Sequence, residues 1–358
     1  MEPKLVPLSE LGRRELARWR ELADRSLEPN PFFDPSFVLP AARSVGESDD
    51  VAIMRMERDG DWVACLPVVI ERKLVGSPFV LATWRNPYSF LGTPLVAPGH
   101  LESFATALAM TVRQRDHGRF LALRGCGEGR VLEAIRAAVA DHGRLTTAYE
   151  DCHRRATLER RENADYFEGI KPRHRREMAR LRRRLGDELE GEVRTVDRTD
   201  DREAPAEFLQ LEASGWKGRA GTAMATSGDR DFFHSICDDF RAMGRLRLLA
   251  LEGGGQTVAM KVDLSAGDTL YGFKIGFDER YAHYSPGVLL EVDSVGLFHE
   301  RRSERLFDSC AQAGNRMINR LWPDRRSIDT VVLGRRGPST GALRIARLAL
   351  AANGGGGG

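Results

Sequence analysis

The chain has 358 residues, of which 42% are apolar and 30% charged, and its formal net charge is +2. This balance is typical of a folded globular protein and excludes an intrinsically disordered one. No apolar run approaches the roughly 20 residues that a helix needs to cross a bilayer. Because the first residues contain no apolar signal-peptide core, we expect a cytoplasmic protein without a membrane span; peripheral association with a membrane stays open.

The spacing of the cysteines predicts neither a disulfide framework nor a bound metal ion. The five cysteines, Cys65, Cys126, Cys152, Cys237 and Cys310, are scattered, and none occurs in a CxxC spacing. Reduced thiols in a reducing compartment are the simpler interpretation, and no metal site is predicted.

In the first half, short elements alternate between helical and strand periodicity. Apolar residues recur at helical intervals over residues 8–22, until a Phe-Phe-Asp-Pro segment at 32–35 interrupts them. Two alternating runs then flank an Asp-Gly-Asp turn at 59–61, which is typical of a β-hairpin. The elements expected are a helix over 8–22, strands over 51–57 and 62–71, a helix over 101–115, a strand over 120–124 and a helix over 131–141.

The second half repeats this order with clearer signals. Three glycines at 253–255 join two alternating runs, and Val258, Met260, Val262 and Leu264 line one face of the second run. The elements expected are helices over 205–214 and 233–243, strands over 245–252, 256–264 and 269–275, a helix over 287–299 and strands over 305–308 and 328–333. The repeated order predicts an α+β protein of two similar domains.

One strand–loop–helix segment, residues 271–290, has the clearest functional signal. Its polar loop ends in Ser285, Pro286 and Gly287, where a helix is expected to begin. The first turn of a helix offers unpaired backbone N–H groups and the positive end of the helix dipole, which suit a pyrophosphate. The same tripeptide is also an ordinary helix start with proline in the first turn, and both interpretations stay open.

A strongly basic segment lies between residues 171 and 184, where eight lysines and arginines accompany one acidic residue, Glu177. His174, Met178, Leu181 and Leu185 follow helical spacing, so the arginines are expected to point away from the core. A solvated helix face has the same pattern. So many like charges repel one another, however, which favours an anionic partner.

Four motifs of the second half, in this order, resemble those of CelD-type acetyltransferases of bacterial exopolysaccharide clusters, which are relatives of the Fem peptidyltransferases in the GNAT family. The resemblance covers roughly residues 160–335. The motifs are Lys-Pro-Arg-His-Arg-Arg-Glu at 171–177, Gly-Trp-Lys-Gly-Arg at 215–219 with Gly-Thr-Ala at 221–223, Tyr-Ser-Pro-Gly at 284–287, and Asp-Ser-Cys at 308–310 with residues 315–322.

The resemblance implies a fold of two GNAT-like domains, residues 1–160 and 161–340, each a mixed sheet flanked by helices. A final segment, 341–358, ends in five glycines and is expected to be disordered. The implied reaction transfers an acyl group, acetyl first of all, from acyl-CoA to an amine or hydroxyl of a cell-envelope or exopolysaccharide precursor. The acceptor is then a small or sugar-linked molecule that can carry phosphate, and neither DNA nor a metal ion takes part.

The resemblance also assigns candidate site residues. The acyl-CoA site is expected at Tyr284, Ser285, Pro286, Gly287, Val288 and Leu289, and the acceptor at Trp216, Lys217, Lys171, Arg175 and Arg176. The catalytic candidates are Asp308, Lys274 and Tyr271. Asp308 is the candidate base, because its carboxylate is negatively charged. Lys274 could act as a base only if burial lowered its pKa. Tyr271 is either a proton donor to the leaving thiolate or a residue of the core.

Two rival functions stay open. One is a Fem-like peptidyltransferase that uses aminoacyl-tRNA, and the other is a non-catalytic effector that binds an anionic nucleotide through residues 173–184. The chain contains no P-loop, GxGxxG, HExxH or GxSxG motif. Nucleotide hydrolysis, redox chemistry and zinc or serine hydrolysis therefore have no support in the sequence.

Overall fold

The computed structural model describes residues 2–45, 51–71, 80–113, 120–162, 166, 170–215, 221, 223–301 and 303–335. The chain forms two compact units, residues 1–154 together with 326–358, and residues 155–325. In the described part, no helix is long and apolar enough to span a bilayer. The C-terminal segment expected to be disordered, 341–358, lies outside these ranges.

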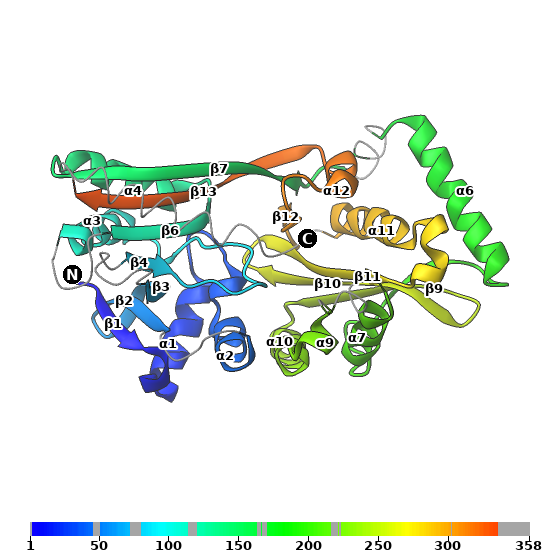
Figure 1. Ribbon diagram of the computed structural model, residues 1–358, viewed down its shortest axis with the longest axis horizontal. Coiled ribbons are helices and arrows are strands. Elements are labelled where there is room, and N and C mark those ends of the chain that lie inside the picture. The colour runs from blue at the N-terminus through cyan, green and yellow to red at the C-terminus, as the bar shows by residue number, and fades with distance from the viewer. Residues whose placement is uncertain are drawn as a thin grey trace. The chain divides into compact units, whose positions relative to one another are not determined.

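The first unit combines a mixed sheet with helices on both faces (Figure 1). Its elements are β1 (Lys4–Pro7), η1 (Leu8–Glu10), α1 (Arg13–Asp24), η2 (Pro31–Phe33), α2 (Pro35–Ser44), β2 (Ala52–Arg58), β3 (Asp61–Glu71), β4 (Val80–Thr83), β5 (Leu95–Val96), α3 (Leu101–Arg113), β6 (Phe120–Gly127), α4 (Arg130–Asp141) and β13 (Asp324–Arg335). The strands follow the order β1-β2-β3-β4-β6-β13, with β5 beside β3. Among the pairings of these strands between described residues, that of β4 with β6 is parallel and the others are antiparallel.

The second unit has the same kind of architecture. The strand β7 (Leu145–Glu159) begins in the first unit and enters the second at residue 155. The further elements of the second unit are α6 (Pro172–Glu188), β8 (Arg194–Asp197), α7 (Ala204–Ser214), α9 (Met224–Ser227), α10 (Arg230–Ala242), β9 (Leu246–Gly253), β10 (Gln256–Ala266), β11 (Thr269–Phe277), η3 (Glu279–Tyr284), α11 (Pro286–Glu300), β12 (Leu306–Asp308) and α12 (Arg316–Leu321). The strand order is β7-β12-β11-β10-β9-β8, and in the described part of this unit β11 and β12 run parallel while the other neighbours run antiparallel. In Figure 1, α11 lies on one face of this sheet and α7, α9 and α10 on the other.

The two units repeat one topology. Each has four antiparallel strands, a fifth strand parallel to the fourth, and a sixth strand antiparallel to the fifth. One crossover helix, α3 or α11, joins the fourth strand to the parallel fifth one, as a parallel connection requires. The expected α+β class, with mixed sheets flanked by helices, is confirmed.

The observed units differ from the expected domains at the C-terminal side. The second domain was expected to reach residue 340, whereas residues from 326 onward belong to the first unit. The reason is the pairing of β13 with β6, which runs from Ile328 opposite Gly127 to Gly334 opposite Phe120. A strand at 328–333 follows from its apolar pattern, but its partner strand, far away in sequence, does not.

An apolar core beneath α11 holds the elements that form the candidate site. Phe298 of α11, Phe307 of β12 and Trp322 after α12 are almost fully buried and belong to one apolar cluster. Burying one such side chain contributes roughly 1.5–3 kcal/mol to folding, so these rings hold α11 and α12 against the sheet.

Candidate functional site

The candidate site begins where β12 leaves β11. The two strands pair only from Thr269 opposite Leu306 to Tyr271 opposite Asp308, although β11 continues to Phe277. On its other side, β11 pairs with β10, and a register shift leaves Phe273 as an extra residue between the paired positions. Such a bulge bends a strand locally and is common beside binding sites.

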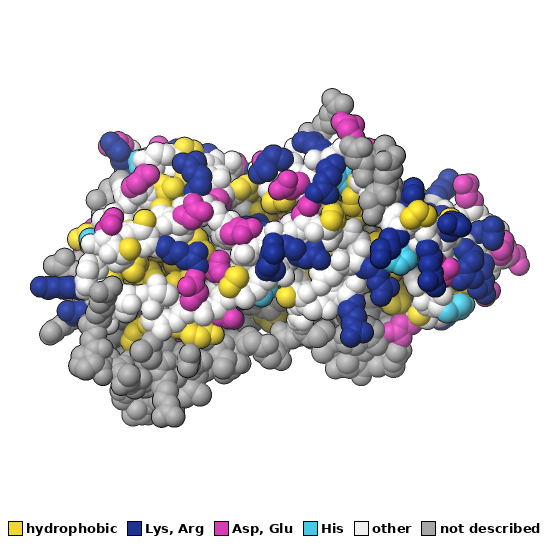
Figure 2. All heavy atoms as spheres, turned by 90° about the horizontal axis from the view of Figure 1, so that it is seen from above, with side chains coloured by type: hydrophobic (Ala, Val, Ile, Leu, Met, Phe, Trp, Pro, Cys, Tyr) yellow, Lys and Arg dark blue, Asp and Glu magenta, His cyan; other side chains and the backbone are white. Residues whose placement is uncertain are grey.

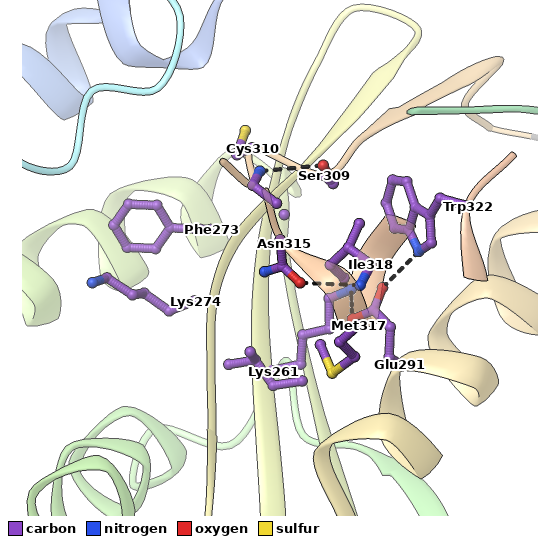
Figure 3. A pocket seen from close by; sticks show the side chains of 13 residues that line it. Lys261, Phe273, Lys274, Glu291, Ser309, Cys310, Asn315, Met317, Ile318 and Trp322 are labelled. Atoms are coloured by element: carbon purple, nitrogen blue, oxygen red, sulfur yellow. Dashed lines mark hydrogen bonds and ion pairs between the residues drawn. The ribbon is translucent and has the colours of Figure 1, made fainter. Parts of the chain in front are cut away.

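A cavity of about 190 Å³ lies at this divergence, inside the second unit (Figure 3). Its lining comes from β10, β11, α11, the loop after β12, and α12 with its flanking residues. The lining residues are Lys261, Gly272, Phe273, Lys274, Ile275, Glu291, Ser309, Cys310, Ala311, Asn315, Met317, Ile318 and Trp322.

The two faces of the sheet both contribute to this lining. Figure 3 shows Phe273 and Lys274 on one side of the strands, and Glu291, Met317 and Trp322 on the other. The ring of Phe273 stacks 6.4 Å from that of Phe233 in α10, on the face opposite α11. The cavity therefore occupies the gap that opens in the sheet as β11 and β12 separate.

Asn315 is one of the neutral polar residues of the cavity wall. It is the N-cap of α12, and its Oδ1 accepts a hydrogen bond of 3.1 Å from the Ile318 backbone N–H. Capping fixes the side chain, because the cap supplies an acceptor that the first turn of a helix lacks. The amide nitrogen has no hydrogen-bond partner among the described residues, so it is available to a ligand in the cavity.

A buried charge pair forms the base of the cavity. Lys261 Nζ donates a hydrogen bond of 2.7 Å to Glu291 Oε2, and Trp322 Nε1 donates one of 3.1 Å to Glu291 Oε1. Behind them, Asp263 accepts two hydrogen bonds from Arg247, of 3.0 and 2.8 Å. Two cations and two carboxylates, all with side chains at most 7% exposed, thus balance one another, as buried charges require.

Comparisons with known proteins identify this architecture. Residues 172–317 match the family model described as the acetyltransferase (GNAT) domain. FemX superposes with a TM-score of 0.58 at 8% identity, over 92% of this chain and 96% of FemX. The C-terminal domain of a putative lysylphosphatidylglycerol synthetase from Agrobacterium fabrum gives a TM-score of 0.53 at 12% identity, over 94% and 96% of the two chains. For L-PGS from Bacillus licheniformis the TM-score is 0.50 at 12% identity, over 90% and 97%. A search of the curated proteins found no match.

The fold is the GNAT fold. The matched segment contains the whole cavity lining except Ile318 and Trp322. The GNAT-type resemblance inferred from the sequence is thereby confirmed at the level of the fold.

The expected catalytic residues have different surroundings. Lys274 lines the cavity, whereas Tyr271 and Asp308 do not. Asp308 is fully buried; its Oδ2 accepts a hydrogen bond of 2.7 Å from Arg155, and its Oδ1 one of 2.9 Å from the Cys310 backbone N–H. A carboxylate whose two oxygens are both engaged is suited to structural support. Its role as a base stays a prediction, and so do the roles of Lys274 and Tyr271.

The expected acyl-CoA residues surround the start of α11. Ser285 adopts a left-handed conformation with φ 54°, and the backbone N–H groups of Val288 and Leu289 both donate to its carbonyl. Tyr284 and Leu289 are buried in one apolar cluster, and Val288 packs against another.

The glycine and proline of this loop are also buried. A Cβ at Gly287 would lie 3.3 Å from the ring of Phe277, so glycine allows α11 to approach β11 closely. Pro286 occupies the first turn of α11, as its fixed φ favours. These contacts explain the residues structurally, and their contact with a donor stays a prediction.

The basic segment forms α6, as its spacing predicts. Figure 2 shows basic side chains gathered at the end of the second unit where α6 lies. Lys171, Arg175 and Arg176 are exposed and have no ion pair with a described residue. Farther along, Arg182 pairs with Asp293 of α11 at 2.6 Å, and Arg184 lies 5.7 Å from the ring centroid of Tyr284. The C-terminal half of α6 is therefore held beside the start of α11.

Two predicted site residues lie outside the described part of the chain, and some residues of the cavity were not predicted. Trp216 and Lys217 lie outside the described residues. Lys261, Glu291 and Asn315 were not among the predicted site residues. The sequence did contain a signal for Lys261 and Glu291. Each is a charged residue within an otherwise apolar run, Lys261 at Met260–Val262 and Glu291 at 288–292.

Proposed function

We propose that the protein is an acyltransferase that takes a short acyl group, acetyl first of all, from acyl-CoA and transfers it to an amine or hydroxyl. The cavity at the divergence of β11 and β12 carries this proposal. Past Tyr271, β12 no longer pairs with β11, so an extended ligand can lie along that edge. The pantetheine arm of CoA contains two amides, which suit hydrogen bonding to a strand edge.

The phosphates of the donor would lie at the other end of β11. This strand leads through η3 into α11, whose first turn can receive an anion through the helix dipole and the backbone N–H of Gly287, because the N–H groups of Val288 and Leu289 already donate to the Ser285 carbonyl. Arg184 belongs to the neighbouring half of α6, lies 5.7 Å from the ring centroid of Tyr284 and adds positive potential there. The reactive end of the donor would then reach the cavity, which is lined by residues 272–275.

The acceptor is proposed from the CelD resemblance and the charge of α6. A precursor of an exopolysaccharide or of the cell envelope supplies the amine or hydroxyl. A phosphate on it would be bound by Lys171, Arg175 and Arg176, whose exposed cations have no acidic partner among the described residues. Guanidinium groups fit phosphate oxygens in a bidentate manner.

Aminoacyl-tRNA is the second candidate donor. The protein has the fold of FemX and of a putative lysylphosphatidylglycerol synthetase, and α6 offers the arginine-rich face that a polyanion needs. The cavity favours acyl-CoA, because its size and its position at a strand edge suit a narrow flexible arm.

Isothermal titration of the full chain with acetyl-CoA, CoA and charged tRNA tests the proposal. We expect acetyl-CoA to bind with a Kd in the micromolar range, equivalent to roughly −8 kcal/mol, and tRNA to bind weakly and in a salt-dependent manner. Tight tRNA binding without any CoA binding would favour the peptidyltransferase function over the acyl-CoA-dependent one. Binding of a free nucleotide alone would favour a non-catalytic effector.

A further inference from the structure

Lys261 is a buried ammonium whose hydrogen-bonding capacity is only partly used. Its side chain is 5% exposed and lines the cavity. Among the described residues it makes one hydrogen bond, the 2.7 Å contact with Glu291, while Asp263 Oδ1 lies 3.6 Å away, beyond hydrogen-bond distance. An ammonium has three N–H donors, and buried donors are normally satisfied. The unused donors therefore point to a ligand.

The position of this ammonium suits the reactive end of a thioester. Nζ lies 4.7 Å from the ring centroid of Phe307 and 5.7 Å from that of Trp322. Phe307 is the second-last residue of β12, directly before the divergence from β11. The side chain thus extends from β10, beneath β11, towards the gap where the two strands separate.

The surroundings hold the side chain of Lys261 in place. Glu291 is fixed by Trp322, and Asp263 by Arg247, which also donates a hydrogen bond of 2.7 Å to Ser294. The four charges balance, so a ligand that adds a full negative charge would remain uncompensated here. A neutral carbonyl oxygen that becomes negative only during the reaction gains most from such a fixed donor.

We propose that Lys261 is a catalytic residue that donates a hydrogen bond to the carbonyl oxygen of the donor thioester; this rests on the proposed acyl-CoA function. The acceptor's nitrogen or oxygen forms a bond to the carbonyl carbon, and the C=O π pair moves to oxygen. Lys261 stabilises that oxyanion. When the pair returns, the C–S bond breaks, and the thiolate receives the proton that the acceptor loses, which yields CoA and the acylated acceptor.

Binding of two CoA derivatives measures this contact without knowledge of the acceptor. Acetyl-CoA has the carbonyl oxygen, whereas S-ethyl-CoA lacks it and is otherwise of similar shape. We expect wild-type protein to prefer acetyl-CoA by about tenfold, the value of one hydrogen bond from a charged donor. In Lys261→Met/Glu291→Gln, which removes one charge of each sign, the preference should fall below about twofold.

The outcomes separate this inference from the proposed function. If neither CoA derivative binds to wild-type protein, the acyl-CoA function itself fails. If both bind but a folded double variant keeps the tenfold preference, Lys261 does not contact the carbonyl and the inference is overturned. Infrared spectroscopy of bound acetyl-CoA gives an answer even if the variant does not fold. The thioester C=O band must move to lower frequency in wild-type protein, and an unshifted band overturns the inference.

Discussion

Arg155 Nη2 lies 2.7 Å from Asp308 Oδ2, and both side chains are buried where β7 pairs with β12. This ion pair ties the strand that enters the second unit to the strand that bounds the cavity. Asp308 also accepts a hydrogen bond from the backbone N–H of Cys310, whose own φ of 54° is unusual for a residue with a side chain. Asp308 thereby sets the course of the loop that lines the cavity.

Asp308→Asn should therefore act first on stability. Replacing one partner leaves the Arg155 guanidinium buried without its counter-charge, which costs about 3–5 kcal/mol. Chemical denaturation of the variant measures this loss, and Asp268→Asn serves as the control, because its partner Arg305 and Asp268 itself are largely exposed. A variant of normal stability that binds acetyl-CoA but has lost turnover would instead identify Asp308 as the base.

Filling the cavity should weaken donor binding. Ala311 lines the cavity and is half-buried, whereas Ala313, two residues later, is exposed. We expect Ala311→Trp to lower acetyl-CoA affinity at least tenfold, equivalent to about 1.4 kcal/mol, and Ala313→Trp to leave it unchanged. Titration calorimetry on both variants measures the difference. Equal affinities would place the donor elsewhere.

Charge reversal on α6 should affect a phosphate-bearing acceptor more than the donor. For Arg175→Glu/Arg176→Glu we expect the acceptor KM to rise sharply and thermal stability to change by less than about 0.5 kcal/mol, because both residues are exposed. The KM should also rise with salt, since such attraction is screened over roughly 10 Å at 0.1 M.

The matched control for α6 is Arg13→Glu/Arg14→Glu, two adjacent exposed arginines at the start of α1. Candidate acceptors are phosphate-bearing sugars, tested beside charged tRNA. Unchanged acceptor kinetics at low salt would show that α6 is only a solvated face. Loss of tRNA binding alone would favour the peptidyltransferase function.

His299 should make the second unit sensitive to mild acid. Burial lowers the pKa of its imidazole below the ordinary value, and Nδ1 accepts a hydrogen bond from the Arg161 backbone N–H that protonation would break. The unfolded chain then binds a proton that the folded chain does not. The stability that neutral His299 contributes is complete above its unfolded pKa of about 6.5 and is lost as the pH falls below it.

Thermal unfolding between about pH 7.5 and 5.5 tests this expectation. The fall in Tm should be smaller in His299→Gln than in wild-type protein, while the exposed His283→Gln should behave like wild type. Parallel curves for wild type and His299→Gln would show that His299 does not contribute to acid sensitivity.

Periodicity in the sequence predicts most elements around the site. The runs that became β9, β10, β11 and α11 are apolar at regular spacing, and local pattern is sufficient for them. The helix α2 was not expected, because the segment at 32–35 resembles a break. In fact Asp34 accepts a hydrogen bond from the Ser36 N–H and Pro35 begins the helix, so the apparent break is a cap.

The chemistry of the cavity was harder to predict, because its residues meet only in the folded chain. Lys261 and Glu291 are 30 positions apart, and the local sequence pattern of neither segment indicates that the two side chains pair. The long strand β7 was missed for a similar reason: most of its residues up to 154 are at least partly exposed, so it shows no apolar alternation. Partner strands and buried charge pairs depend on tertiary contacts that local patterns do not encode.

The position of bound CoA tests the central claim most directly. A crystal structure of the full chain with CoA should show the pantetheine arm along residues 272–275 of β11, with its sulfur in the cavity beside Lys261 and Asn315. The pyrophosphate should then contact the start of α11. CoA bound elsewhere on the chain, or an empty cavity at a CoA concentration that saturates the protein in solution, would contradict the account.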